Sequence, residues 1–475
     1  MPGWENEALS AFNDWHFKFV DSGPLHCPIT SFKVSRSDKL NIMLTTTAPA
    51  DAKSPAVEPP SGTVRINNER ATLESIGGLQ GEFRGIVTLS YEVTHDGGQS
   101  VRAETAKIYH ASAQIVPGAT TAYIIEWVAN LSSRSLTWPD PIRTETVDQK
   151  TRTIGRDAYK LVLPTEAKRT QTGMGAAKIN VEGVDIYVCC AGRDEDSTMK
   201  SASIIYVGNP TQEFRNKIRR ALSFTLGTYL VHLGHTCFAA DWTMNSFECH
   251  SAYSIDKRVF DLPVVMPASL HDKWQGGISN DGLQRSVTAL FQCDERLNFA
   301  DLSWAYWHAL CATVHIAPVH WGAAIELLVR RYVESSDGRI PEKLVADNAI
   351  WAGLVGRLER EVDETAIPES ARDSLKQTIR GANRVSIRSL MDAVLEDVGI
   401  VLGQEERRAW RRRNEAAHGM ELEAGEELEL IRDVKLLKVL FHRLLLGVSR
   451  ASDNYIDQVT PGFFIRRIPE PVPDA

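Results

Sequence analysis

Short apolar runs rich in Val, Ile, Thr and Tyr recur between residues 29 and 207. Turn-forming Gly, Pro and Asp residues separate them, and this combination is typical of β-strands. No helical segment intervenes, so we expect the strands to pair antiparallel in a sandwich or barrel. The predicted strands are residues 40–47, 86–94, 106–116, 121–129 and 179–189.

The pattern changes to a helical one at Asn209. Asn209 can cap a helix, Pro210 fits its first position, and Gln212 occupies the capping-box position. Apolar residues then recur at helical spacing. We expect this helix to end near Gly234, with short strands following between residues 237 and 265.

From about residue 302 the apolar positions follow a helical period almost to the end. Gly, Pro or Ser marks the short connections, which is typical of a helical bundle. Residues 461–475 contain four prolines and are expected to form a tail or a surface strap. The predicted helices are residues 304–316, 321–333, 344–362, 370–380, 387–401, 405–418 and 426–448.

Together these patterns predict an α+β protein with two domains, within the range expected for 475 residues. Residues 1–300 form the predicted β-rich domain, an antiparallel sandwich or barrel with one or two helices. Residues 301–475 form the predicted all-α bundle with its proline-rich tail. We expect the first domain to sense or regulate and the second to carry the chemistry.

Composition excludes several classes of protein. The net charge is −8 and the acidic excess occurs in both domains, so a nucleic-acid site would have to be a local basic patch. No apolar run reaches the roughly 18 residues of a membrane span. The first residues lack the basic charge of a signal peptide, and seven cysteines do not form a disulfide framework. We therefore expect a cytoplasmic protein with no membrane contact.

One local basic patch stands out, because residues 407–413 contain five arginines. Their predicted helix ends at His418, which Gly419 follows. A histidine transfers protons near neutral pH, an arginine offers donors to a phosphate, and Asn414 can orient either one. These residue types suit phosphodiester cleavage without a metal. A solvated basic helix face is the alternative.

The helical positions of these residues limit how they can meet. Asn414 shares a helix face with His418 and with Arg411. Arg413 lies five positions before His418, about 140° around the helix axis. The two therefore converge only if the Arg413 side chain curls, if the helix end departs from ideal geometry, or if a second subunit completes the site.

A second group of residues could bind a metal, because zinc prefers histidine and cysteine. The candidates are His232, His235, Cys237, Cys249 and His250. No Cys-x2-Cys pair or usual zinc-finger spacing accompanies them. We expect His232 and His235 to close the apolar helix. We expect Cys237 and Cys249 to be core residues of short strands. No metal and no cofactor is assigned. The sequence also lacks a Walker-type loop and a Gly-x-Ser-x-Gly elbow.

The segment from Arg413 through Asn414 to His418 resembles the Arg–polar–x3–5–His motif of HEPN domains. Residues 323–328, AAIELL, resemble an early HEPN helix with the pattern Ala-Leu-Glu-x-Leu. A β-rich region before such a bundle is similar to the layout of the ApeA-like HEPN group. The resemblance covers residues 318–450, and in the first domain it is one of layout plus the predicted helix over 222–234.

This resemblance implies a metal-independent endoribonuclease that acts in anti-phage defence by abortive infection. His418 would be the general acid or base at the ribose 2′-hydroxyl or the leaving oxygen. Arg413 would bind the scissile phosphate, and Asn414 would orient one of them. The products would be a 2′,3′-cyclic phosphate and a 5′-hydroxyl, and a homodimer or higher homo-oligomer would build the cleft.

Three further residues are assigned beside the motif, Arg411 and Arg412 from spacing alone. We expect Arg411 and Arg412 to bind neighbouring RNA phosphates. Glu326 is either a buried polar partner of the motif or a solvated helix residue.

Two other functions stay open beside the nuclease. In one, the HEPN bundle is catalytically silent and serves RNA binding or dimerisation, while the β domain binds a ligand or protein. In the other, the β domain is an independent enzyme. Its lack of a recognised nucleophile or metal pattern counts against this function. In the leading hypothesis the β domain responds to a phage-derived trigger or restrains the nuclease.

Overall fold

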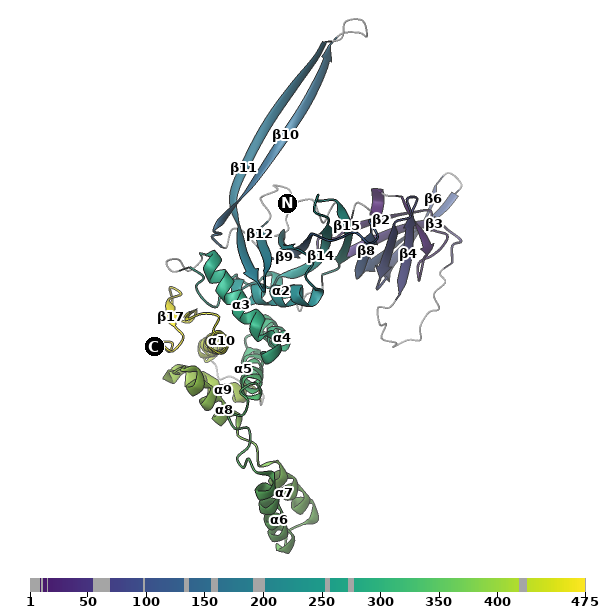
Figure 1. Cartoon of the computed structure of the whole chain (residues 1–475). Coiled ribbons are helices and arrows are strands. Elements are labelled where there is room, and N and C mark those ends of the chain that lie inside the picture. The colour runs from purple at the N-terminus through teal and green to yellow at the C-terminus, as the bar shows by residue number, and fades with distance from the viewer. Residues whose placement is uncertain are drawn as a thin grey trace. The chain divides into compact units, whose positions relative to one another are not determined.

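The structure is a computed structural model that describes residues 9, 12–14, 16–53, 69–96, 99–131, 136–154, 161–190, 201–252, 257–271, 277–417 and 425–474. Only the backbone is described for residues 144, 146–154, 161–171, 201, 257 and 414–417. The predicted α+β class is confirmed, with a β-rich N-terminal region followed by helices (Figure 1). Two compact units share the chain: Met1–Arg219, Thr228–Val264 and Leu270–Gln284 form the first, and Arg220–Gly227, Val265–Ser269 and Arg285–Ala475 form the second.

The first unit contains two antiparallel sheets. The larger has eleven described strands in the order β1-β4-β5-β8-β15-β14-β9-β13-β12-β11-β10, and the smaller has the order β2-β3-β7-β6. The strands are β1 (Phe17–Asp21), β2 (Ser31–Arg36), β3 (Ile42–Pro49), β4 (Arg70–Ser75), β5 (Gln80–Arg84), β6 (Val87–Asp96), β7 (Gln99–Ile108), β8 (His110–Gln114), β9 (Tyr123–Ala129), β10 (Asp140–Ile154), β11 (Leu161–Val181), β12 (Val184–Cys190), β13 (Ser201–Val207), β14 (Val231–Phe238) and β15 (Met244–His250).

Alternate strand residues supply an apolar core to this unit. Ile42 and Leu44 of β3 are completely buried, and so are Phe83 of β5 and Cys249 of β15. Because neighbouring strand residues point to opposite faces, the residues on either side of Cys249 lie on the other, polar face of the large sheet. That face positions the histidine cluster described below.

The predicted strands match the described ones with two subdivisions. Residues 40–47, 86–94 and 121–129 correspond to β3, β6 and β9. The predicted strand over 106–116 is divided at Tyr109 between β7 and β8. The predicted strand over 179–189 is divided by a turn at Glu182 and Gly183, both with positive φ, between β11 and β12.

The predicted helix near residue 209 exists, but its predicted end at Gly234 is wrong. Helix α2 (Gln212–Leu226) stops at Gly227, which has a φ of +65°. A side chain at this position would collide with the backbone carbonyl of Val265. The following apolar residues form β14 instead, because a short apolar run does not distinguish a buried strand from a buried helix.

The second unit is the helical one. All seven predicted helices occur. One further helix, α3, was not predicted, and it begins before residue 302, where the sequence pattern predicted the bundle to start. Helix α5 packs on α4, α8, α9 and α10, and α10 also packs on α9. The helices after α2 are α3 (Asn280–Leu297), α4 (Phe299–Cys311), α5 (Ala317–Glu334), α6 (Asn348–Glu364), α7 (Glu369–Gly381), α8 (Ile387–Val398), α9 (Gln404–Ala417) and α10 (Glu427–Ser449), and a 3-10 helix spans Lys257–Phe260.

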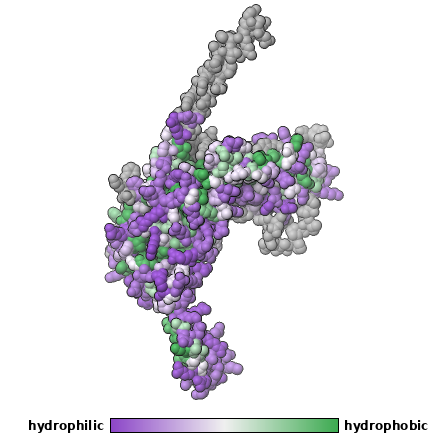
Figure 2. Space-filling view, viewed as in Figure 1, coloured by the Kyte–Doolittle hydropathy of each residue, from purple (hydrophilic) through white to green (hydrophobic). Residues whose placement is uncertain are grey.

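Helices α6 and α7 form a hairpin with no buried residue. Ion pairs join them, between Arg380 and Glu359 at 2.6 Å and between Lys376 and Asp363 at 2.7 Å. The side chain of Ile350 is 63% exposed. Figure 2 shows hydrophobic surface on this hairpin. Across the described helices, none combines the length and apolarity that a membrane crossing requires.

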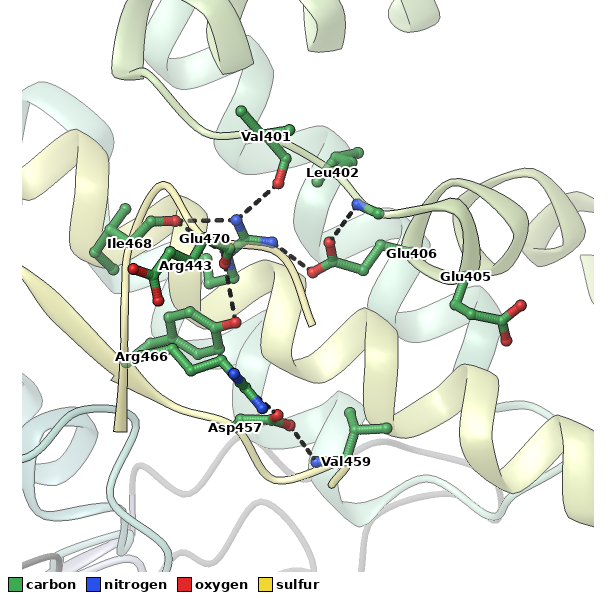
Figure 3. A network of polar contacts seen from close by, with 12 residues as sticks. Val401, Leu402, Glu405, Glu406, Arg443, Asp457, Val459, Arg466, Ile468 and Glu470 are labelled. Carbon is green, nitrogen blue, oxygen red and sulfur yellow. Dashed lines mark hydrogen bonds and ion pairs between the residues drawn. The ribbon is translucent and has the colours of Figure 1, made fainter. Parts of the chain in front are cut away.

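The proline-rich C-terminal segment is a strap. Strands β16 (Asn454–Ile456) and β17 (Ile465–Arg467) pair with each other after α10. Beyond them, the carbonyl oxygen of Ile468 accepts a hydrogen bond from Arg443 of α10 at 3.0 Å (Figure 3). The Tyr455 hydroxyl donates to the carbonyl oxygen of Glu470 at 3.0 Å. These contacts hold the strap on the bundle.

Candidate functional site

Helix α9 carries the arginine run, and buried charges fix its first turn. Glu405 and Glu406 lie in that turn, where acidic side chains complement the helix dipole. One carboxylate oxygen of Glu406 accepts from the Gly403 amide at 2.9 Å, and the other accepts from Arg443 at 2.5 Å. Both members of the Glu406–Arg443 ion pair have side chains that are 0% exposed. The start of α9 is therefore attached to α10.

Arg413, about two turns after Glu406, is also buried, at 7% exposure. Its Nη2 donates to Oε1 of Glu326 on α5 at 2.7 Å, and its Nη1 donates to the Trp410 carbonyl oxygen at 2.5 Å. Its guanidinium carbon lies 3.3 Å from the centre of the Trp410 ring, a cation–π position. Gly322 of α5 leaves room for it, since a Cβ there would approach the Arg413 Cδ to 2.8 Å.

This arrangement decides what Arg413 can do. Glu326, whose side chain is 32% exposed, already occupies Nη2. Nη2 carries a second N–H, so a phosphate oxygen that binds it would lie beside the Glu326 carboxylate, whose negative charge opposes that binding. The sequence left open whether Glu326 is a partner of the motif or a solvated residue, and the structure places it in contact with Arg413.

The structure describes only the backbone of Asn414 and does not describe His418. The backbone of Asn414 belongs to α9, but its side chain is not described. His418 lies outside the described residues, immediately after the last residue of α9 in the sequence. The predicted meeting of Arg413 with His418 stays a prediction.

The two arginines expected to bind neighbouring phosphates differ in their surroundings. Arg412 pairs with Glu429 at 2.9 Å and with Asp433 at 3.4 Å, both on α10. Arg411 is exposed, and its Nε donates to the Arg407 carbonyl oxygen at 3.2 Å. Within the described residues Arg411 forms no ion pair. Arg411 is thus the more accessible cation of the two.

A second group of ionisable side chains occupies the polar face of the large sheet. His232, His235 and His250 each offer one ring nitrogen, and these atoms lie within 4.8 Å of one another. A second triad of His110, Glu248 and His250 meets the same distance. Of the five metal candidates in the sequence, the three histidines come together. Cys249 lies in the apolar core on the other face, and Cys237 belongs to neither triad.

A β-bulge brings two of these histidines onto one face. Residues three apart on a regular strand point to opposite faces, which would separate His232 from His235. The register of β14 against β9 shifts between His232 and Gly234. Gly234 has a φ of +144°, and a side chain there would collide with the carbonyl of Glu248. The expectation that both histidines end a helix is wrong, because they lie on this bulged strand.

Neighbouring strands add the other members in register. His250 of β15 pairs with His110 of β8, and Glu248 of β15 pairs with His235 of β14. His110 was not predicted as a member, because it is remote along the chain from the other histidines. Glu248 carries a weak signal, since it lies two residues before His250 and shares its strand face.

Burial sets the charge of this group. It lowers the pKa of His235 and of His250 to about 4, and the pKa of His232 well below its usual 6.5. Hydrogen bonding to His110 lowers the pKa of Glu248 to about 2. At neutral pH the three rings are therefore uncharged and the carboxylate is ionised.

A buried carboxylate beside the cluster is neutralised by α2. Glu126 of β9 is 1% exposed, and its oxygens lie 3.0 Å from Arg219 and 3.6 Å from Arg215. The Tyr206 hydroxyl donates to it at 3.3 Å. Its oxygen lies 3.8 Å from Nε2 of His232, too far for a hydrogen bond.

Comparisons with known proteins give this chain no family. No protein-family profile and no curated protein matches it. Among solved structures, the NetB toxin of Clostridium perfringens in its membrane-inserted form matches with 8% identity and a TM-score of 0.07. The match covers 39% of this chain and 57% of the toxin chain. A TM-score this low carries no argument about fold or function.

Proposed function

We propose that the helical unit is a metal-independent endoribonuclease of the HEPN type, resembling the ApeA-like group. The observation that carries the proposal is the fixed position of α9. Glu406 and Arg443 hold its first turn, and Glu326 holds Arg413 near its end. His418 follows this anchored helix in the sequence, and rigid support of this kind suits a catalytic group.

The proposed chemistry uses the residues as the sequence assigned them. His418 removes the proton from a ribose 2′-hydroxyl, or returns one to the leaving 5′-oxygen. The 2′-oxygen attacks phosphorus and the bond to the 5′-oxygen breaks, which leaves a 2′,3′-cyclic phosphate and a 5′-hydroxyl. Arg413 stabilises the charge that develops on the phosphate through its guanidinium N–H groups. Asn414 orients one of the reacting groups.

The accessible Arg411 extends this site to a neighbouring phosphate, and Arg412 contributes less because it is paired with α10. We further propose that the enzyme acts in the cytoplasm as an abortive-infection effector. A homodimer or higher homo-oligomer builds the RNA cleft through the bundle. The β-rich unit senses a phage-derived trigger or restrains the nuclease until one arrives.

A second function is favoured by one observation, the burial of Arg413. Both Nη atoms of this side chain already donate to the protein. In a catalytically silent bundle, used for RNA binding or dimerisation, Arg413 would serve only to join α9 to α5. The β-rich unit would then be the working part, as a ligand- or protein-binding sensor.

Phage infection separates these functions. Cells that express the wild type are expected to stop growing on infection and to release few phages. His418→Ala should abolish this protection, whereas His315→Ala, which removes an exposed histidine of the same unit, should preserve it. Protection by His418→Ala equal to that of the wild type would favour the silent bundle.

A further inference from the structure

The histidine cluster contains buried ring nitrogens that have no hydrogen-bond partner. They are Nε2 of His232, Nδ1 of His235 and Nε2 of His250. Buried polar atoms without partners are rare in folded proteins, and each one calls for an explanation such as an ion. His235 is only 8% exposed, so bulk water does not solvate its ring. Three such atoms in one cluster indicate a missing common partner.

We infer that this cluster binds a single divalent transition-metal ion of the zinc class through His232, His235 and His250. Zinc–nitrogen bonds of about 2.0–2.1 Å place tetrahedral ligand atoms about 3.3 Å apart. The donor atoms lie within 4.8 Å of one another, so small side-chain rotations close the site. Imidazole donors suit zinc, whereas Mg²⁺ and Ca²⁺ require oxygen ligands.

Glu248 is the fourth ligand in this arrangement. Its Oε2 lies 3.9 Å from Nδ1 of His235 and 3.9 Å from Nε2 of His250. Nε2 of His110 lies 3.5 Å from the same oxygen and orients the carboxylate, a usual second-layer contact in metal sites. Glu126 is excluded as a ligand because Arg219 and Arg215 already pair with it.

The cluster also offers the ion a path from solvent. The Glu248 side chain is 41% exposed. Its cross-strand neighbour Ser112 lines an open groove of about 510 Å³ on the same sheet, together with Thr72 and Glu82. Exchange with added metal is therefore feasible in the folded protein.

This inference concerns the first unit and does not depend on the proposed ribonuclease. All the proposed ligands lie within Thr228–Val264, and the residues proposed for RNA cleavage belong to the second unit. Loss of metal binding and loss of RNA cleavage can thus be observed separately.

Zinc binding by the purified full-length protein tests the inference. The protein is stripped with a chelator and dialysed against Zn²⁺, and bound metal is measured by elemental mass spectrometry. The wild type should hold about one zinc ion per chain. The double variant His235→Ala/His250→Ala should hold none. His95→Ala, which removes an exposed histidine of β6, should bind as the wild type does.

A milder variant covers the case in which the double variant fails to fold. Glu248→Gln keeps the size of a partly exposed side chain and should weaken zinc affinity by at least about 10-fold in a calorimetric titration. Zinc should also raise the melting temperature of the wild type but not of a folded double variant. A wild type that binds no stoichiometric zinc overturns the inference, as does zinc binding that is equal in the wild type and Glu248→Gln.

Discussion

Arg443 and Glu406 form an ion pair with no exposed side-chain surface, which joins the C-terminal part of α10 to the first turn of α9. Arg443 also donates to the carbonyl oxygens of Val401 at 2.9 Å and Ile468 at 3.0 Å (Figure 3). One side chain thus connects α10, the loop before α9 and the C-terminal strap. The position of the arginine run depends on it.

Removing one partner of this pair should destabilise the protein strongly. Glu406→Ala leaves the Arg443 charge buried without a counter-charge, so we expect unfolding to become easier by about 3–5 kcal/mol. Denaturant unfolding of the wild type and the variant measures this. Glu396→Ala, at an exposed position of α8, is the matched control and should change stability by less than about 0.5 kcal/mol. Equal stability of the two variants would contradict the account.

The contact between Glu326 and Arg413 predicts an opposite effect on stability and on RNA binding. Glu326→Gln removes the charge that pairs with a buried guanidinium, which should cost about 1–3 kcal/mol of stability. It also removes an anion that would repel a phosphate bound at the same guanidinium. Binding of an RNA with a 2′-deoxy group at the cleavage position should therefore tighten, by roughly 5-fold. Weaker RNA binding by this variant would show that the Glu326 charge does not oppose phosphate binding at Arg413.

Arg411 and Arg412 make a matched pair of positions. Arg411→Ala should weaken RNA binding and lower the salt dependence of binding by about one phosphate contact, because its side chain is exposed. Arg412→Ala should mainly reduce stability, since its guanidinium pairs with Glu429 and Asp433. RNA binding across a salt series, with unfolding curves for both variants, measures the difference. Identical effects of the two changes on binding would refute it.

Stability should fall in mild acid because His442 is buried as a neutral ring. Burial and nearby Lys438 lower the pKa of His442 well below its usual 6.5, and the Tyr306 hydroxyl lies 3.1 Å from its Nε2. Burial raises the pKa of Tyr306, so that hydroxyl stays protonated. The unfolded chain then binds a proton that the folded protein does not. The stability from this residue is complete above pH 6.5 and decreases as the pH falls below it.

Chemical unfolding between pH 5 and 7 measures this effect. The slope contributed by His442 should approach about 1.4 kcal/mol per pH unit at the acid end. His442→Gln, which cannot be protonated, should reduce the slope by that amount. His315→Gln, at an exposed position between α4 and α5, should leave it unchanged. A slope in His442→Gln equal to that of the wild type would contradict the assignment.

The parts of the fold predicted correctly are those whose local pattern is decisive. The long apolar helix α10 and strand β3 each have a period that only one kind of element satisfies. The failures have tertiary causes. Helix α2 ends where Gly227 approaches the backbone of Val265, a contact that the residues before Gly227 do not indicate. The apolar run after it then pairs as a strand.

The same reasoning explains which site residues the sequence could indicate. A motif on one helix, such as the one from Arg413 to His418, is visible because its members lie close together in the chain. The histidine cluster is visible only in part, because the sequence indicates His232, His235 and His250 as candidates but not His110 or Glu248. Its geometry depends on a bulge at Gly234 and on the pairing of His250 with His110, and strand pairing between remote segments leaves no local pattern.

RNA cleavage in the presence of EDTA tests the central claim most directly. The full-length wild type and His418→Ala are incubated with RNA, and the ends of the products are analysed. The account predicts cleavage by the wild type alone, leaving 2′,3′-cyclic phosphate and 5′-hydroxyl ends. Cleavage that His418→Ala retains in full, or wild-type cleavage that EDTA abolishes, would contradict a metal-independent HEPN ribonuclease.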